Sequence, residues 1–343
     1  FLFNHLGYLS NSDVKQIFYK LGNQAINLMK TNAHYDIPGN PSTAKSSALK
    51  LREEATADSL KVMSLEDWQF WKENGYIVIK NAVPREQAEA TANFLWEFEE
   101  KDPNDASTWY TAARAEMKMK ELAGTGMVEV YNNQHLWNNR QTQRVYDAFC
   151  DVWGTDKLWV TIDRANLNFP VREGSNYQPF IHWDYDPETR PQNVQGVLAL
   201  ADQTDTNMGG FQCIPYLYKN YDTWKLTQPE DRNRFQPDTT GLEDEIVKVK
   251  MEAGDLLIFN SCLAHGIRLN QSKDKVRIAQ YISMMPAQEE DKELRDWRIN
   301  SWKNRIAPEG YAFPGDPRNF EQLKYPTAEL NELGEKLLGL KSW

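Results

Sequence analysis

The fold prediction starts from the stretch Ala253-Gly254-Asp255-Leu256-Leu257-Ile258-Phe259 and the Ala264-His265-Gly266 that follows it. The first three residues favour a turn, and the four apolar residues after them are typical of a short buried strand. We expect the chain to leave this strand through a polar exit at which His265 lies. A side chain at such an exit is well placed to contribute to a functional site.

Short strand-like segments dominate the chain from residue 158 to residue 283. Each is rich in β-branched, aromatic or alternating apolar residues and is bounded by turn-forming residues. The expected strands are 158–168, 180–184, 194–201, 210–214, 246–250, 256–259 and 276–283. Many short strands of this kind predict a mainly β protein with flanking helices, built on a double-stranded β-helix (jelly roll, cupin-like) core.

Helical patterns flank this β region. A helix capped by Ser64 and ended by Gly75 precedes a strand at 76–80, and Pro84 begins a second helix. An earlier helix over 11–29 and an irregular connection over 31–47 are also expected. For the 343 residues we predict an N-terminal helical extension and linker (1–63), one jelly-roll domain (64–287) and a C-terminal helical extension packed on the core (288–343), with a helix at 327–338.

The pair His182 and Asp184 is the main chemical signal. Alternate side chains of an extended segment point the same way, so both can bind one cation while Trp183 points elsewhere. With His265, they supply two imidazoles and one carboxylate and leave other coordination positions open, which is the ligand set of non-haem Fe(II) oxygenases. The alternative is that these are satisfied polar residues at the ends of a barrel.

Two further predicted strands carry polar side chains that could lie near these three metal ligands. Arg277 stands near the start of the predicted strand 276–283, so we expect it close to the metal ligands. Alternation over 158–168 places Arg164, Asn166 and Asn168 on one strand face. That face could bind a ligand, or it could face solvent or tie down the following loop, and the residues leave both interpretations open.

These motifs resemble the phytanoyl-CoA dioxygenase (PhyH-like) family of 2-oxoglutarate oxygenases. The resemblance extends over about residues 64–287 and includes the N-terminal order of helix, Gly, strand, Pro and helix. Its most specific part is the His182, Asp184 and His265 set. The supporting motifs are Asn207-Met208-Gly209-Gly210-Phe211-Gln212-Cys213-Ile214-Pro215, Gly266, Asn270 and Arg277.

The resemblance implies an enzyme that uses Fe(II), 2-oxoglutarate and O2. Arg277 would pair with the distal carboxylate of 2-oxoglutarate, and Asn166 is a further candidate for binding the cosubstrate. The implied reaction oxidises an unactivated C–H bond of a small-molecule metabolite, releasing succinate and CO2. Hydroxylation is the default outcome, with desaturation or cyclisation as variants. Apart from the resemblance, strand alternation and position near the ligands or in the 214–218 segment make Arg164, Asn168, Tyr185 and Tyr216 the candidate substrate-side residues.

This chain also departs from the family pattern. A different sequence, Ile214-Pro215-Tyr216-Leu217-Tyr218, replaces a loop of the family, so the substrate contacts of that loop are not transferred. Ile267 stands where a small hydroxyl residue often helps to bind the cosubstrate. Related halogenases replace the carboxylate ligand with a small residue, so the retained Asp184 argues against halogenation.

Composition narrows the partners. The net charge of −10 disfavours a nucleic-acid or anionic-membrane surface. No apolar run is long enough to span a bilayer, so we expect a soluble protein. Three cysteines without a Cys-x-x-Cys pair favour a reduced, cytoplasmic setting without a disulfide framework. The expected partner is a small-molecule substrate, and the oligomeric state is left open.

Two other classes of function remain as alternatives at this stage. A cupin-like metalloenzyme could use the same three ligands without 2-oxoglutarate, although Arg277 argues against it. The jelly roll could also be a non-catalytic binding module, for which failure to bind Fe(II) or Mn(II) would be the sign.

Overall fold

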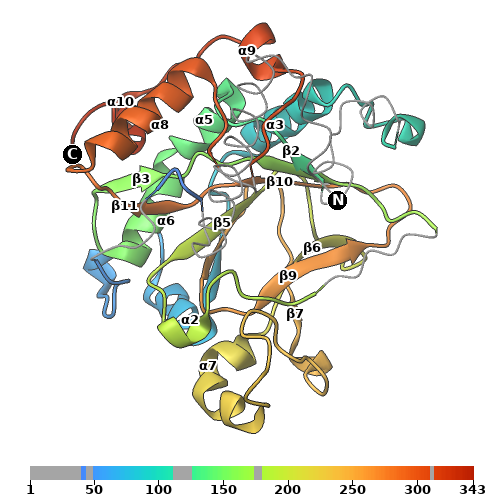
Figure 1. Cartoon of the computed structure of the whole chain (residues 1–343), viewed down its shortest axis with the longest axis vertical. Helices are drawn as coiled ribbons and strands as arrows, with labels where there is room; N and C mark the ends of the chain where they lie inside the picture. The colour runs from blue at the N-terminus through green and yellow to red at the C-terminus, as the bar shows by residue number, and fades with distance from the viewer. Residues whose placement is uncertain (1–39, 44–48, 111–125, 174–179, 310–312) are drawn as a thin grey trace, which may run out of the picture.

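A six-stranded antiparallel sheet forms the centre of the protein (Figure 1). The computed structural model describes residues 40–43, 49–110, 126–173, 180–309 and 313–343. Along the main sheet the strands are β1 (Tyr76–Ile79), β8 (Leu256–Asn260), β5 (Val194–Ala199), β10 (Arg277–Tyr281), β4 (Ala165–Asn168) and β2 (Met127–Val128).

A second, three-stranded sheet faces part of the main sheet. Its strands, in spatial order, are β7 (Val247–Lys248), β6 (Met208–Cys213) and β9 (His265–Asn270). Apolar side chains of β5, β8 and β10 pack against side chains of β6 and β9, and they form one core between the two sheets. Two antiparallel sheets in face-to-face packing constitute the predicted jelly-roll architecture.

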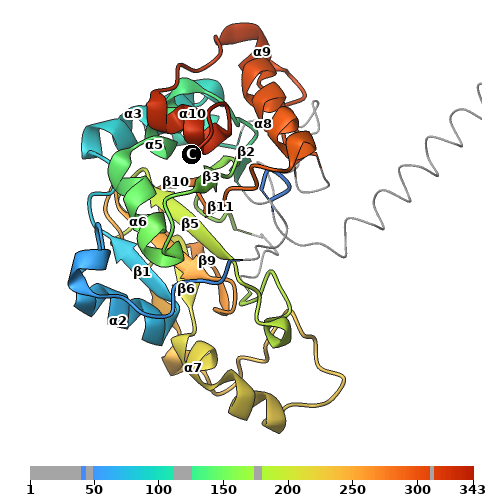
Figure 2. The same ribbon diagram turned by 90° about the vertical axis from the view of Figure 1, so that its left-hand side faces the viewer.

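Helices cover the other face of the main sheet, where a larger apolar core lies between them and the strands (Figure 2). The α-helices of this layer within the described residues are α2 (Leu65–Asn74), α3 (Arg85–Phe98), α5 (Gln134–Arg140), α6 (Gln143–Trp153), α8 (Lys292–Asn304), α9 (Phe320–Lys324) and α10 (Glu332–Leu338). Helix α7 (Pro215–Trp224) lies outside this layer and packs in an apolar cluster of its own. The short 3-10 helices are η1 (Ala57–Ser59), η2 (Ala106–Thr108), η4 (Pro187–Thr189), η5 (Lys225–Thr227) and η6 (Glu243–Glu245).

The predicted N-terminal order of helix, strand and helix is confirmed. Ser64 caps α2 by accepting a hydrogen bond from the Asp67 backbone, and Gly75 ends the helix in the left-handed conformation at φ 73°. Strand β1 follows, and α3 begins directly after Pro84. The buried face of α3 includes the residues expected there, namely Ala88, Thr91, Phe94, Leu95 and Phe98.

The prediction of one strand over 158–168 is wrong. The chain forms β3 (Leu158–Val160), which pairs with β11 (Met284–Pro286), and then β4, which pairs with β10. Between them, the Thr161 amide and hydroxyl both bond to Ser283 as the chain passes from one sheet to the other. A change of pairing partner ends a strand even where the alternation of residue types continues.

The secondary structure of the segments that contain His182, Asp184 and His265 also differs from the prediction. Residues 180–184 form no regular strand, and His182 makes only an isolated bridge to His265. Strand β8 ends at Asn260, and His265 is the first residue of β9 rather than the exit of the preceding strand. Residues 265–270 had no predicted strand because their partners on β6 are distant in sequence.

One helix was not predicted, and the start of another was placed too early. Residues 215–224 form α7, with Pro215 in the first turn, where the missing amide of proline costs no hydrogen bond. The C-terminal helix α10 begins at Glu332, because Asn331 caps it through the Gly334 amide, rather than at residue 327. The predicted helix 11–29 and nearly all of the connection 31–47 lie outside the described residues.

Cys150, Cys213 and Cys262 are all free thiols, as expected from their number and spacing. Within the described ranges, no helix combines the length and apolarity needed to cross a membrane.

Candidate functional site

The predicted residues His182, Asp184 and His265 come together at one end of the space between the two sheets. Each offers a ligand atom, and the three atoms lie within 4.8 Å of one another. The Nε2 atom of His182 is 3.4 Å from Oδ1 of Asp184, and Nε2 of His265 is 3.4 Å from Oδ2 of the same carboxylate. Two imidazole nitrogens and a carboxylate in this arrangement can hold a divalent metal on one face.

Backbone pairing brings the two histidines together. The His182 amide donates to the His265 carbonyl at 2.8 Å, and the His265 amide donates back at 2.9 Å. Trp183 points away from the ligands into an apolar cluster around α7, where its ring packs 5.7 Å from that of Tyr221. Its indole N–H donates to the Cys262 carbonyl at 3.0 Å, which ties the ligand segment to the turn before β9.

The imidazole of His265 is held from three sides. Its Nδ1 lies 3.0 Å from the Leu263 carbonyl, which fixes the proton on Nδ1 and leaves Nε2 for a metal. The Phe259 ring packs 4.5 Å from the imidazole, and the Phe211 ring stacks on it at 5.6 Å. The Nδ1 atom of His182 is buried and has no hydrogen-bond partner among the described residues.

Asp184 is held as an ionised carboxylate. Its partial burial opposes its ionisation, but the contacts with His182 and His265 outweigh that effect and hold the pKa of the carboxyl well below its usual value. Gln195 of β5 also donates a hydrogen bond to Oδ2 at 2.6 Å. The group is therefore ready to bind a cation without first losing a proton.

Arg277 begins β10 and is fully buried. Its Nη1 donates to Oδ1 of Asn166 at 2.8 Å and its Nε donates to Oε1 of Gln203 at 3.4 Å, while Nη2 is buried without a partner. Both partners are neutral, and within the described residues no carboxylate pairs with this guanidinium. A buried cation with an unused donor fits a carboxylate ligand, because burying a charge without a counterion is costly.

A second buried arginine, Arg268 of β9, lies near Arg277. Its guanidinium donates to the Phe211 carbonyl at 2.5 Å and to the Gly209 carbonyl at 2.6 Å. Burial, together with repulsion from Arg277, lowers its pKa to about 10. A Cβ at Gly210, whose φ is 113°, would lie only 2.6 Å from its Nη2, so a glycine is required beside this side chain.

The remaining predicted residues lie in different surroundings. Asn166 contacts Arg277, and Asn168 is opposite Arg277 in the β4–β10 register with a buried Oδ1 that lacks a partner among the described residues. Arg164 is buried in an ion pair with Glu129 at 2.7 Å. The Tyr185 hydroxyl accepts a hydrogen bond from Asn193, and Tyr216 is exposed on α7.

Sequence reasoning missed Gln195, Gln203 and Arg268. No motif marks these residues, since a Gln or Arg within a strand is ordinary in composition. Alternation along β5 from the apolar Val197 would have placed Gln195 on the inner face, and that is the signal that could have found it.

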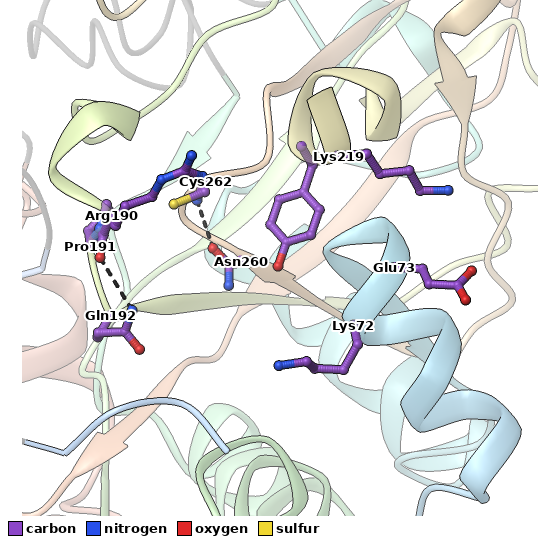
Figure 3. Close-up of a pocket in the computed structure, with 9 residues that line it drawn as sticks. Lys72, Glu73, Arg190, Pro191, Gln192, Lys219, Asn260 and Cys262 are labelled. Atoms are coloured by element: carbon purple, nitrogen blue, oxygen red, sulfur yellow. Dashed lines mark hydrogen bonds between the residues drawn. The ribbon is translucent and has the colours of Figure 1, made fainter. Parts of the chain in front are cut away.

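A pocket of about 570 Å³ lies between α2, α7 and the segment before β5, and none of the three candidate ligands lines it (Figure 3). Figure 3 shows side chains from α2, from the loop before β5 and from α7 around it, including Lys72, Arg190 and Lys219. Tyr218 also lines this cavity. On its wall, burial raises the pKa of the Cys262 thiol to about 11, so the thiol is protonated at neutral pH.

Comparisons with known proteins agree with this geometry. The family model described as phytanoyl-CoA dioxygenase (PhyH) matches residues 71–279. Ava biosynthesis cluster protein O of Aspergillus versicolor is 28% identical over 266 residues, covering 70% of this chain and 83% of the relative.

Two solved structures share the fold at low sequence identity. A hypothetical protein from Escherichia coli is 18% identical with a TM-score of 0.59, and the match covers 96% of this chain and 93% of that one. The GlcNAc-inducible gene 2 protein of Candida albicans is 14% identical with a TM-score of 0.57, covering 80% and 76%. Since the family model extends over more than half of the chain, this protein belongs to the phytanoyl-CoA dioxygenase family and is a non-haem Fe(II)/2-oxoglutarate-dependent dioxygenase.

Proposed function

We propose that this enzyme oxidises a C–H bond of a small-molecule metabolite, with hydroxylation as the default outcome, and that His182, Asp184 and His265 are its iron ligands. The observation that carries the proposal is the meeting of these three ligand atoms within 4.8 Å. Three protein ligands on one face leave positions for the cosubstrate and dioxygen.

Arg277 is the proposed anchor for the distal carboxylate of 2-oxoglutarate. Its unpartnered Nη2 is an available donor, and Asn166 and Gln203 hold the other guanidinium nitrogens in place. Because these partners are neutral, they orient the guanidinium without neutralising it. A planar, pre-oriented guanidinium is well suited to a carboxylate.

When bound, the iron and 2-oxoglutarate supply the oxidising chemistry, in which O2 is consumed and the cosubstrate is converted to succinate and CO2. The residues of this chain position the reactants, and the orientation of the substrate decides between hydroxylation, desaturation and cyclisation. The printed name of the Aspergillus versicolor relative refers to a biosynthesis cluster, which supports a natural-product metabolite as substrate.

Exposure of the ligands suggests the side from which the substrate approaches. The side chains of His182 and Asp184 are 30% and 34% exposed, whereas that of His265 is 8% exposed. Phe180, whose ring lies 4.9 Å from the His182 imidazole, is 49% exposed. We propose that substrate binds on this side, with Asn168, Tyr185 and Tyr216 as further candidates for contact. The guanidinium of Arg164 is instead buried in its ion pair with Glu129.

The test is a turnover assay with a metabolite library. Purified protein is incubated anaerobically with Fe(II) and 2-oxoglutarate, exposed to O2 with each pool, and analysed for substrate-stimulated succinate and for a product heavier by one oxygen. A loss of two hydrogens would instead indicate desaturation or cyclisation. His182→Ala should abolish both signals, whereas His135→Ala should retain them, because His135 stacks on Phe94 in the helical layer.

Two outcomes would favour the other classes of function. Metal-dependent conversion of a substrate without succinate would support a cupin-like enzyme that does not use 2-oxoglutarate. Failure of the wild-type protein to bind Fe(II) or Mn(II) would support a non-catalytic jelly roll.

A further inference from the structure

Gln195 makes a contact that links the main sheet to the proposed metal ligands. Its Nε2 donates to Oδ2 of Asp184 at 2.6 Å. On the same strand, Val197 and Ala199 belong to the core between the two sheets. Because side chains alternate along β5, Gln195 lies on this inner face at the end of the strand nearest the ligands.

The strand register places Gln195 beside Phe259, and each of these two residues contacts one of the proposed metal ligands. Gln195 pairs with Phe259 of β8, and the Phe259 ring packs 4.5 Å from the imidazole of His265. One cross-strand pair therefore contacts two of the three ligands, the carboxylate by a hydrogen bond and the imidazole by ring packing. Asp184 itself lies outside any regular strand, so it needs support from such a contact.

The chemistry of the side chain is suited to this position. An amide N–H donates a hydrogen bond to a carboxylate oxygen. Because the amide carries no charge, it neither repels the metal cation nor competes with Asp184 as a strong metal ligand. The bond also restricts rotation of the carboxylate, whose two oxygens face different imidazoles. A carboxylate without this restraint could bind a metal through both oxygens and fill a position needed by cosubstrate or dioxygen.

We propose that Gln195 is a positioning residue that holds the Asp184 carboxylate for coordination through one oxygen and keeps the remaining metal positions open. The inference rests on the proposed function, because it assumes that the triad binds the metal. Outer contacts of this kind orient the ligands, and their loss typically weakens metal affinity by about 10- to 100-fold.

The test compares Gln195→Met with wild type by anaerobic titration with Co(II), which reports binding through its visible absorption without any turnover. Methionine keeps the length and volume of the side chain but removes the donor. We expect the Kd for Co(II) to rise by about 10- to 100-fold and the shape of the absorption bands to change as the carboxylate reorients. The matched control is Gln192→Met, because Gln192 precedes β5 and accepts a bond from the Leu51 amide rather than contacting the ligands.

Thermal unfolding of the metal-free proteins separates positioning from general stability. The metal-free melting temperature of Gln195→Met should stay close to that of wild type, while the stabilisation gained on adding Co(II) should shrink. If Gln195→Met does not fold, Gln195→Asn is titrated instead, since it keeps the amide but is too short by one methylene to make the contact.

The outcomes are distinguishable. A variant with wild-type Kd and an unchanged Co(II) spectrum would overturn the positioning role, as would a lower metal-free melting temperature with unchanged metal affinity. Failure of the wild-type protein to bind Co(II) would instead overturn the metal site on which the proposed function depends.

Discussion

The metal end and the Arg277 end of the site are built differently. At the metal end, His182 and Asp184 lie in a segment without regular strand structure and are about one-third exposed. At the other end, Arg277 lies within a central strand and is fully buried. In the proposed function, the first end admits substrate and dioxygen. The second end excludes water, because a charge pair is stronger in a dry environment.

The two ends also differ in the groups that surround their charged side chains. The Asp184 carboxylate faces two imidazoles and the Gln195 amide, and these contacts hold it ionised. Arg277 has only neutral partners and one unused nitrogen among the described contacts. We infer that the metal end is assembled before a ligand arrives, whereas the arginine end is completed by the carboxylate of the cosubstrate.

The largest effect is expected from Asp184→Ala. Removal of the only carboxylate in the triad should weaken Co(II) or Fe(II) binding by more than about 100-fold, the upper range for loss of a mere outer contact, and reduce succinate release to background. Asp222→Ala, at an exposed pair with Arg190, is the control. Retained metal affinity in Asp184→Ala would show that the metal binds elsewhere.

Arg277→Gln should affect the other end alone. Loss of one member of a buried charge pair costs about 2 kcal/mol or more, so the KM for 2-oxoglutarate should rise by about 30-fold or more. Steady-state kinetics measure this change, and a Co(II) titration of the same variant should give a Kd near that of wild type. Equal losses in both measurements would show that the two ends of the site depend on each other and are not built independently.

Trp183→Phe should produce a smaller effect, confined to the metal end. The ring remains in its apolar cluster, but the Cys262 carbonyl loses its donor, a loss of about 1 kcal/mol in the free energy of unfolding. Chemical denaturation of the metal-free protein measures it. A modest weakening of Co(II) affinity should accompany the loss, while the KM for 2-oxoglutarate should not change. A raised KM with intact metal binding would contradict this assignment.

The smallest expected effect concerns salt. Exposed charges are screened over about 10 Å at 0.1 M ionic strength, but buried pairs are screened much less. The KM for 2-oxoglutarate should therefore change by less than about twofold between roughly 0.05 and 0.3 M NaCl, as measured by initial rates at saturating substrate. A steep rise would indicate that exposed cations, rather than the buried Arg277, attract the cosubstrate.

Local patterns predicted a large part of the fold. The capped helix α2, strand β1 and helix α3 follow from Ser64, Gly75 and Pro84, whose effects act within a few residues. The strands β5, β8 and β10 were also expected near their observed positions. The failures occurred where the outcome depends on distant partners, as at the break between β3 and β4 and at the start of β9.

The residue types of the proposed ligand set could be read from the chain alone. Two histidines and an aspartate at this spacing, together with the family motifs, predicted an iron oxygenase, because two imidazoles and one carboxylate with open positions are typical of non-haem Fe(II) sites. The tertiary structure alone decided what surrounds these residues. Gln203 and Arg268 bond to partners 74 and 57 residues away, and contacts at such separations leave no local pattern in the chain. Alternation along β5 could place Gln195 on the inner face, but only the folded chain brings Asp184 within reach of its amide.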